Sequence, residues 1–258
     1  MSRRINAVLD GVQLSEIGPI LIQEVHEPPA DMEITYGARP GRSGQDVLSS
    51  RRRSLKVTIE AAIKELYDLS NRNNILQAVA GWANGSILEL SNHPGQQLHV
   101  VCKNYPALGN VREYTQTISV ELEADENPFW EEKLPAVVSG SGSSGTSQLY
   151  IPGTAPEIPV EATFTPSGAL TSLTVTASCG GVTRSIALSG MSVASGTAVR
   201  LYYSAWDRLE IMAGTTSLLQ YRSAASADDL LIPAGTATLT WSANVSGSMQ
   251  FSARGRWL

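Results

Sequence analysis

Hydrophobic and polar residues alternate along two segments in the first half of the chain. In residues 54–61 (SLKVTIEA) and 112–124 (REYTQTISVELEA), apolar side chains occupy every second position over most of the length. A period of two places all apolar side chains on one face of a β-strand. Both segments are therefore predicted to be strands of an antiparallel sheet with one face buried and the other in water.

A helical pattern lies between these two strands. Apolar residues recur near helical spacing from Leu69 to Ala80, Asp68 or Ser70 can cap the start, and Gly85 follows the end. These signals predict one helix over about residues 69–83.

Turn residues predict two hairpins around this core. Asp10-Gly11 divides the opening segment INAVLDGVQL into a strand pair, and SNHPGQ separates SILEL from LHVVCK. The first part of the chain is thus predicted to be an α+β domain, a small β-barrel or curled antiparallel sheet that carries a single helix.

Short strand-like segments fill the second half of the chain. They are separated by Gly- and Pro-containing turns about 8 to 15 residues apart, and they read VEATFT, LTVTASC, TRSIAL, AVRLYYS, DRLEIM, TSLLQY, ATLTWSA and MQFSARGRW. About eight such strands with no helical pattern are typical of a β-sandwich of jelly-roll type. The expected fold class is therefore mainly β.

The composition changes near residue 135. The chain has 13 Lys or Arg and 18 Asp or Glu up to Lys133, but only 6 of each beyond it, where Ser, Thr, Gly and Ala dominate. The stretch VVSGSGSSGTSQ has the composition of a connector. We therefore expect a first domain over 1–134, a Gly/Ser connector over 135–148 and a second domain over 149–258.

The same stretch matches the dinucleotide pattern GxGxxG at Gly140, Gly142 and Gly145. That motif needs a helix directly after the glycines to hold a pyrophosphate. The residues that follow, TSQLYIPGTAP, contain two prolines and cannot begin a helix. A nucleotide site is therefore not expected here.

Pro128, Phe129 and Trp130 form an apolar cluster within an acidic run at the expected domain boundary. Because two aromatic rings are costly to leave in water, we expect them to cover the open end of the first domain or its seam with the second. A contact between subunits and an exposed ligand-binding tip are the alternatives.

Charge and motifs exclude several classes of function. A net charge of -5 and a pI near 5.3 argue against a specific nucleic-acid partner, and no apolar run is long enough for membrane insertion or a signal-peptide core. The three histidines have no metal-ligand spacing, Cys102 and Cys179 are expected to be free thiols in different domains, and no nucleophile motif occurs. No enzymatic activity, cofactor or metal is expected.

The order of these elements resembles a known family. An opening strand pair, an Arg- and Gly-rich loop, one helix, a long strand that runs into DENPFWEE, and a sandwich with LLIPAGTATLTW near its end are similar to the distal tail proteins (Dit) of long-tailed bacteriophages. NPFW is similar to the family's D-P-F-W segment, but here Glu126 and Asn127 stand between the aspartate and Pro128.

The resemblance implies a structural role in a phage tail tip or baseplate. In that family the first domain forms a six-membered ring below the tail tube, and a galectin-like second domain points outward. It therefore implies a homohexamer with the tail tube protein, hub and tape-measure proteins, and fibre or receptor-binding proteins as partners. The implied location is the virion tail tip, after synthesis in the host bacterial cytoplasm.

Five arginines gather in one Gly-rich segment of the otherwise acidic first domain. They are Arg39, Arg42, Arg51, Arg52 and Arg53. One interpretation is a solvated loop whose charges protect an edge strand, and contact with DNA in the lumen is another. The functional interpretation is a belt between subunits, in which these arginines pair with Glu121, Glu123 or Glu131 of the next subunit.

A carbohydrate-binding sandwich is the alternative function, because exposed aromatic rings can stack on sugars. Alternation places Trp241 with Leu239 and Tyr203 with Leu201, which predicts that both are core residues. Tyr202 and Trp206 remain as candidates for sugar stacking in host-surface adhesion.

Overall fold

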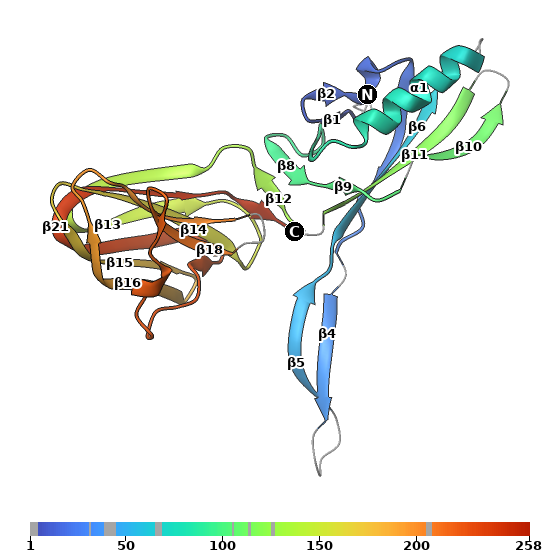
Figure 1. The fold of residues 1–258 in the computed structure, drawn as a ribbon. Helices are drawn as coiled ribbons and strands as arrows, with labels where there is room; N and C mark the ends of the chain where they lie inside the picture. The colour runs from blue at the N-terminus through green and yellow to red at the C-terminus, as the bar shows by residue number, and fades with distance from the viewer. Residues whose placement is uncertain are drawn as a thin grey trace. The chain divides into compact units, whose positions relative to one another are not determined.

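The computed structural model describes residues 5–30, 32–38, 45–64, 69–104, 106–112, 115–124, 127–204 and 208–258. The described residues are mostly in β-strands, with one α-helix, and they form two compact units, Met1–Trp130 and Glu131–Leu258 (Figure 1). The predicted fold class, mainly β with a helix-bearing first part and a β-sandwich after it, is confirmed.

A curled antiparallel sheet forms the centre of the first unit. Its strand order is β10-β11-β6-β3, with β9 also beside β11. The strands are β3 (Ile20–His26), β6 (Leu55–Ile63), β9 (Val101–Cys102), β10 (Ala107–Arg112) and β11 (Thr115–Ala124). Val57 and Ile59 of β6 and Val120 of β11 are fully buried, while Lys56 and Glu121 are exposed. The two strands predicted from alternation are therefore confirmed, together with their buried faces.

A second set of paired strands follows the order β2-β1-β7-β8. It contains β1 (Ala7–Leu9), β2 (Val12–Gln13), β7 (Ile87–Leu90) and β8 (Gln96–His99), so both predicted hairpins are present. Asp10 and Gly11 have positive φ of 49° and 82°, as a tight hairpin turn requires. The Asp10 carboxylate also accepts hydrogen bonds from the backbone N–H groups of Ser86 and Ile87 at 3.0 and 2.9 Å.

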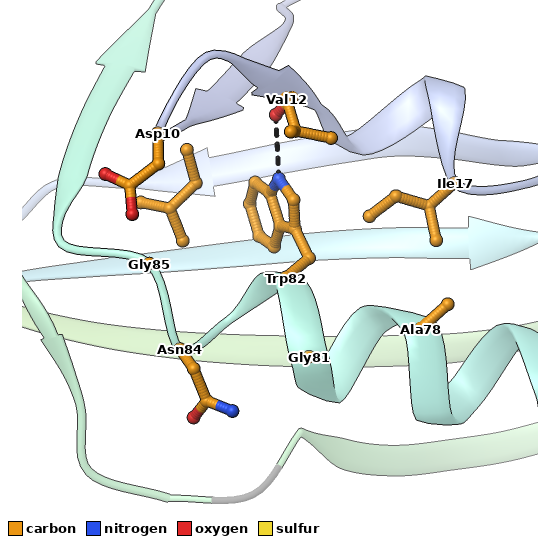
Figure 2. Close-up of a pocket in the computed structure, with 9 residues that line it drawn as sticks. Asp10, Val12, Ile17, Ala78, Gly81, Trp82, Asn84 and Gly85 are labelled. Atoms are coloured by element: carbon orange, nitrogen blue, oxygen red, sulfur yellow. Dashed lines mark hydrogen bonds between the residues drawn. The ribbon is translucent and has the colours of Figure 1, made fainter.

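The predicted helix is α1 (Leu69–Trp82), preceded in the chain by the short 3-10 helix η1 (Leu14–Glu16). Ile75, Val79 and Trp82 form the buried side of α1. The indole Nε1 of Trp82 donates to the carbonyl oxygen of Val12 at 2.8 Å, as Figure 2 shows. This bond ties the end of the helix to the opening hairpin.

Replacing Trp82 with phenylalanine should destabilise the first unit by about 1 to 2 kcal/mol. The change removes the indole donor and leaves the Val12 carbonyl without that partner, while most of the aromatic packing is kept. Urea denaturation of the two proteins, followed by circular dichroism, measures the difference. Identical denaturation midpoints would show that the hydrogen bond contributes nothing to stability.

The second unit is a β-sandwich built around one long ribbon. β13 (Ala136–Ile151) pairs with β21 (Gly235–Ala253) along almost its full length. The first part of β21 also pairs with β15 (Leu170–Cys179), and its last part pairs with β14 (Ile158–Pro166). β21 therefore joins β15 and β14 in one hydrogen-bonded sheet, with β13 paired along it.

The remaining strands extend this sheet at both ends. β16 (Val182–Val193) pairs with β15, while β17 (Val199–Tyr203), β18 (Leu209–Ala213) and β19 (Thr216–Ser217) follow β14 in order. β20 (Leu231–Ile232) also pairs with β14, and the short 3-10 helix η2 (Leu219–Tyr221) follows β19. Every second residue of β14, and of β15 from Leu173 onward, is buried, and these side chains form part of the core.

The expected Gly/Ser connector at 135–148 is wrong. Its residues form most of β13, a paired strand with a register shift between Gly142 and Ser144. The physical reason lies in Trp241, which is directly opposite Gly145. A Cβ atom added at Gly140 or Gly145 would overlap the indole ring of Trp241. The glycines therefore make room for a core side chain and do not mark a flexible link.

A buried ion pair joins the two ends of the second unit. β12 (Trp130–Glu132) contains the division between the units, and β22 (Arg256–Trp257) ends the chain. Arg256 Nε donates to Glu131 Oε1 at 2.7 Å, and the side chains are only 4% and 9% exposed. The Glu132 N–H also donates to the Gly255 carbonyl at 2.9 Å. The start of this unit is thus held to its last strand.

Candidate functional site

Among the described residues, exposed large apolar side chains are most numerous on a two-stranded hairpin in the first unit. It consists of β4 (Met32–Ala38) and β5 (Gln45–Arg52), which pair only with each other within the described parts of the chain (Figure 1). Met32, Ile34 and Tyr36 alternate along β4, so they share one face. They are 49%, 41% and 52% exposed.

The second strand of the hairpin adds to this surface. Val47 lies opposite Tyr36 and is 61% exposed, while Leu48, beside the register shift, is 67% exposed and lies over Gly37 on the other face of the ribbon. An isolated two-stranded ribbon is at best marginally stable in water. Exposed apolar side chains gathered on one element also mark interaction sites. We call Met32, Ile34, Tyr36, Val47 and Leu48 the hairpin patch, and it is the candidate functional site.

The structure places the predicted arginines differently from the expected loop. Arg51 and Arg52 belong to β5, opposite Glu33 and Met32, and the exposed Arg53 follows the strand. The expectation of a loop is therefore wrong for Arg51 and Arg52. Arg39 and Arg42 lie outside the described residues. The basic residues thus adjoin the base of the hairpin patch.

The three predicted carboxylates have different surroundings. Glu121 is exposed on β11 and accepts a hydrogen bond from Asn104 Nδ2 at 3.2 Å. Glu123 pairs with Lys103 Nζ at 3.0 Å and accepts a hydrogen bond from Ser54 Oγ. Glu131 is buried with Arg256. A pairing between Glu131 and an arginine of another subunit is therefore wrong, because its carboxylate is already used inside the second unit.

Phe129 and Trp130 are buried, and Pro128 is half-buried. The Trp130 ring stacks on the His93 imidazole, with centroids 4.2 Å apart and planes 8° apart. His93 Nε2 also pairs with Glu27 at 2.8 Å. Rings that are buried in this way are not an exposed ligand-binding tip.

The candidates for sugar stacking find little support. Tyr202 is half-buried and donates its hydroxyl hydrogen to Glu210 at 3.5 Å, while Trp206 lies outside the described residues. Trp241 is buried as predicted. Tyr203 is half-buried, and its hydroxyl oxygen accepts a hydrogen bond from the Leu230 N–H at 2.6 Å. Among the described residues, no group of exposed aromatic rings marks a sugar site.

An apolar pocket lies beside the end of α1. Its volume is about 460 Å³, and Figure 2 shows Trp82 at its centre with Ile17 and Ala78 on one side and Asp10 and Gly85 on the other. The Asp10 carboxylate accepts hydrogen bonds from the backbone N–H groups of Ser86 and Ile87, which hold it against the start of β7.

Cys102 lies in a second, more polar hollow. Burial raises the pKa of its thiol above the ordinary value, the nearby Glu121 carboxylate raises it further, and together they outweigh the lowering effect of a backbone hydrogen bond with Asn104. The nucleophilic thiolate form is therefore disfavoured.

Among the described residues, no helix is both long and apolar enough to cross a membrane.

The hairpin patch is the feature that sequence reasoning missed. The alternation of Met32, Ile34 and Tyr36 was a usable signal for a strand. Alternation alone, however, predicts a face buried by the rest of the chain. Only the structure shows that this apolar face is exposed.

Comparison with solved structures identifies similar folds. The crystal structure of SPP1 Dit, described as a paradigm of the hub adsorption apparatus in phages that infect Gram-positive bacteria, has a TM-score of 0.72 and 12% identity, and the match covers 98% of this chain and 99% of that one. The chain therefore has the SPP1 Dit fold. Chains of the phage p2 baseplate in its activated conformation with Sr and with Ca also match, with TM-scores of 0.45 and 0.39 and identities of 9% and 8%. These two matches cover 97% of both chains for the Sr form, and 99% of this chain and 98% of the other for the Ca form. No family profile and no curated protein matches the sequence.

Proposed function

We propose that this protein is a structural component of a phage tail tip or baseplate, where it forms a ring between the tail tube and the hub. The observation that carries the proposal is the SPP1 Dit fold, which extends over 98% of this chain and 99% of that one. Both units of the chain are included in that match. The role is one of assembly and does not involve chemistry on a substrate.

The hairpin patch is the proposed contact between subunits. Burial of exposed apolar area is favourable by about 25 cal/mol per Å², and the five residues of the patch are each at least 41% exposed in the single chain. A second copy of the chain is the proposed occupant, because a closed ring repeats one heterologous contact. The free hairpin would gain the partner that a two-stranded ribbon lacks.

Charge supports the same contact. Arg51, Arg52 and Arg53 lie at the base of the hairpin, and the outward face of the curled sheet carries Glu121 and Glu123. In the proposed ring, the arginines of one subunit meet this acidic face of the next. Such pairing orients the subunits and speeds their encounter more than it adds to affinity.

The remaining partners follow from the proposed role. The ring would contact the tail tube protein on one side and hub and tape-measure proteins on the other. The second unit would carry fibre or receptor-binding proteins. The protein would then be located in the virion tail tip after synthesis in the host cytoplasm.

Light scattering coupled to size exclusion tests the ring. The wild-type chain of 27.5 kDa is expected to form a species of about six subunits with a central channel in negative-stain images. Changing Ile34 and Tyr36 to serine should leave a folded monomer, because the apolar contact is lost. Arg51, Arg52 and Arg53 changed together to serine should shift the elution toward smaller species.

A matched control is available on the second unit. Val137 is 49% exposed on β13, so Val137→Ser removes a similar apolar surface outside the hairpin. This variant should assemble like the wild type. Equal assembly of the hairpin variants and the wild type would remove the hairpin from the proposed contact.

A further inference from the structure

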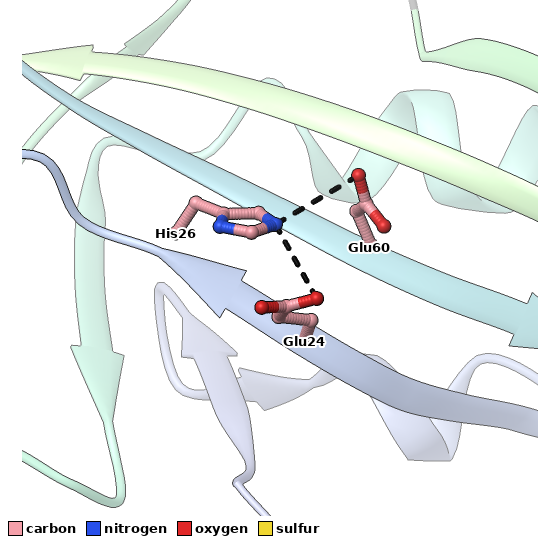
Figure 3. Close-up of side chains that lie close together, drawn as sticks. All are labelled: Glu24, His26 and Glu60. Carbon is pink, nitrogen blue, oxygen red and sulfur yellow. Dashed lines mark ion pairs between the residues drawn. The ribbon is translucent and has the colours of Figure 1, made fainter.

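Three side chains with metal-binding atoms converge on the outward face of the curled sheet. Glu24 and His26 are two residues apart on β3, and Glu60 of β6 lies directly opposite Glu24. Residues at i and i+2 of a strand share a face, and directly opposite residues have neighbouring Cβ atoms. All three side chains therefore leave the sheet at one place. Figure 3 shows the His26 ring nitrogen directed toward both carboxylates.

The distances fit a common ligand. His26 Nε2 lies 3.5 Å from Glu24 Oε2 and 4.0 Å from Glu60 Oε1. One ligand atom from each residue can be chosen so that all three lie within 4.8 Å of one another. A tetrahedral zinc ion with bonds of about 2.0 to 2.2 Å holds its ligand atoms roughly 3.4 Å apart. The side chains are 49% to 61% exposed, so small rotations can close the remaining difference.

The backbone brings the two carboxylates together. The register of β3 against β6 shifts between Ile22 and Glu24, and this shift sets Glu24 opposite Glu60. Like charges directly opposite each other in a sheet are unfavourable. A bound cation would remove this repulsion. Sequence spacing did not reveal the group, because Glu60 is distant from the other two residues along the chain.

The nitrogen donor distinguishes this group from an ordinary acidic patch. Mg²⁺ and Ca²⁺ take oxygen ligands, whereas imidazole suits Zn²⁺, Co²⁺, Ni²⁺ and Cu²⁺. One imidazole with two carboxylates is a mixed set that borderline metals accept, with water completing the coordination.

We propose that Glu24, His26 and Glu60 form a binding site for a divalent transition-metal ion of the zinc class. The site replaces the earlier expectation of no metal. It is independent of the proposed tail-tip role, because it rests only on the geometry of β3 and β6. A bound ion would join these strands close to where the chain leaves for the hairpin, since β3 ends at His26 and β4 begins at Met32.

Calorimetric titration of the full-length protein with Zn²⁺ tests the site, with no histidine tag on the chain. Wild-type protein should bind one equivalent of Zn²⁺ with micromolar affinity. His26→Gln and, separately, Glu60→Gln should each weaken binding about tenfold or more, since each removes one of three ligands. Binding should raise the melting temperature of the wild type and leave that of His26→Gln unchanged.

Two controls separate a built site from general surface binding. His99 is an exposed histidine on β8 outside the group, so His99→Gln should bind Zn²⁺ like the wild type. A large excess of Mg²⁺ should leave Zn²⁺ binding intact. Circular dichroism confirms that each variant is folded.

Three results would overturn the proposal. They are absence of binding heat up to about 1 mM Zn²⁺, equal loss of affinity in His26→Gln and His99→Gln, and displacement of Zn²⁺ by Mg²⁺. Equal loss of affinity in the two histidine variants would indicate scattered surface binding. Displacement by Mg²⁺ would indicate an acidic patch without a specific role for the imidazole. A monomeric wild-type protein that binds Zn²⁺ as expected would contradict ring formation in solution and leave the metal site standing.

Discussion

Gly145→Val is expected to lower the free energy of unfolding of the second unit by about 3 kcal/mol or more. Valine adds a Cβ and two methyl groups at a position where even a Cβ alone would overlap the Trp241 ring. The ring has little room to move, because Trp241 is 5% exposed, lies between Gly145 and Val175 on the neighbouring strands, and packs near Phe251. Overpacking a filled core typically costs 1 to 3 kcal/mol or more.

Thermal unfolding followed by circular dichroism measures this effect. Ser141→Val is the matched control, because Ser141 lies on the same strand with its side chain exposed. Valine at that position should leave the melting temperature nearly unchanged, since it meets no core residue. If both valines lower the melting temperature equally, the glycine has no special relation to Trp241.

Arg256→Met should destabilise the second unit by about 3 to 5 kcal/mol. The substitution leaves the Glu131 carboxylate buried without its ion-pair partner, and an uncompensated buried charge is strongly destabilising. Total stabilities of domains are only about 5 to 15 kcal/mol. Loss of one partner would therefore remove a large part of the stability of this unit.

A second substitution distinguishes the ion pair from simple packing. Changing Glu131 to leucine in the Arg256→Met protein should restore most of the stability, because the buried charge is then removed. Arg222→Met is the control. Its partner Asp228 is 90% exposed, and such pairs contribute about 0 to 1 kcal/mol. Equal losses in urea denaturation for Arg222→Met and Arg256→Met would contradict the importance of burial.

Local patterns predicted the parts of the fold whose partners are close in sequence or whose periodicity is regular. Alternation identified β6 and β11 with their buried faces, and Asp10-Gly11 identified the first hairpin, where the positive φ values agree with the turn chemistry. The helix was found from its apolar spacing and its terminal signals. These features depend on the residues of the segment itself.

The errors arose where a distant residue decides the local structure. The glycines of β13 indicated a connector, but their role depends on Trp241, almost a hundred residues later. The acidic sequence around Glu131 indicated an exposed carboxylate, but the structure buries it against Arg256, a residue distant in sequence. The exposed face of β4 has the same alternation as a buried strand. In each case the deciding information is tertiary.

The β13–β21 ribbon has a consequence for synthesis on the ribosome. β13 is the first long strand of the second unit, and its partner β21 is the last long one, so Ala136 cannot find Ala253 until nearly the whole chain has emerged. Domains generally fold in order as they are made. All residues of the first unit have been synthesised by Trp130, whereas β13 cannot pair until β21 has been synthesised. Its Gly- and Ser-rich composition lacks the hydrophobic, high-β-propensity segments that aggregate. The same glycines that accommodate Trp241 are therefore expected to limit aggregation of β13 while it is unpaired in the nascent chain.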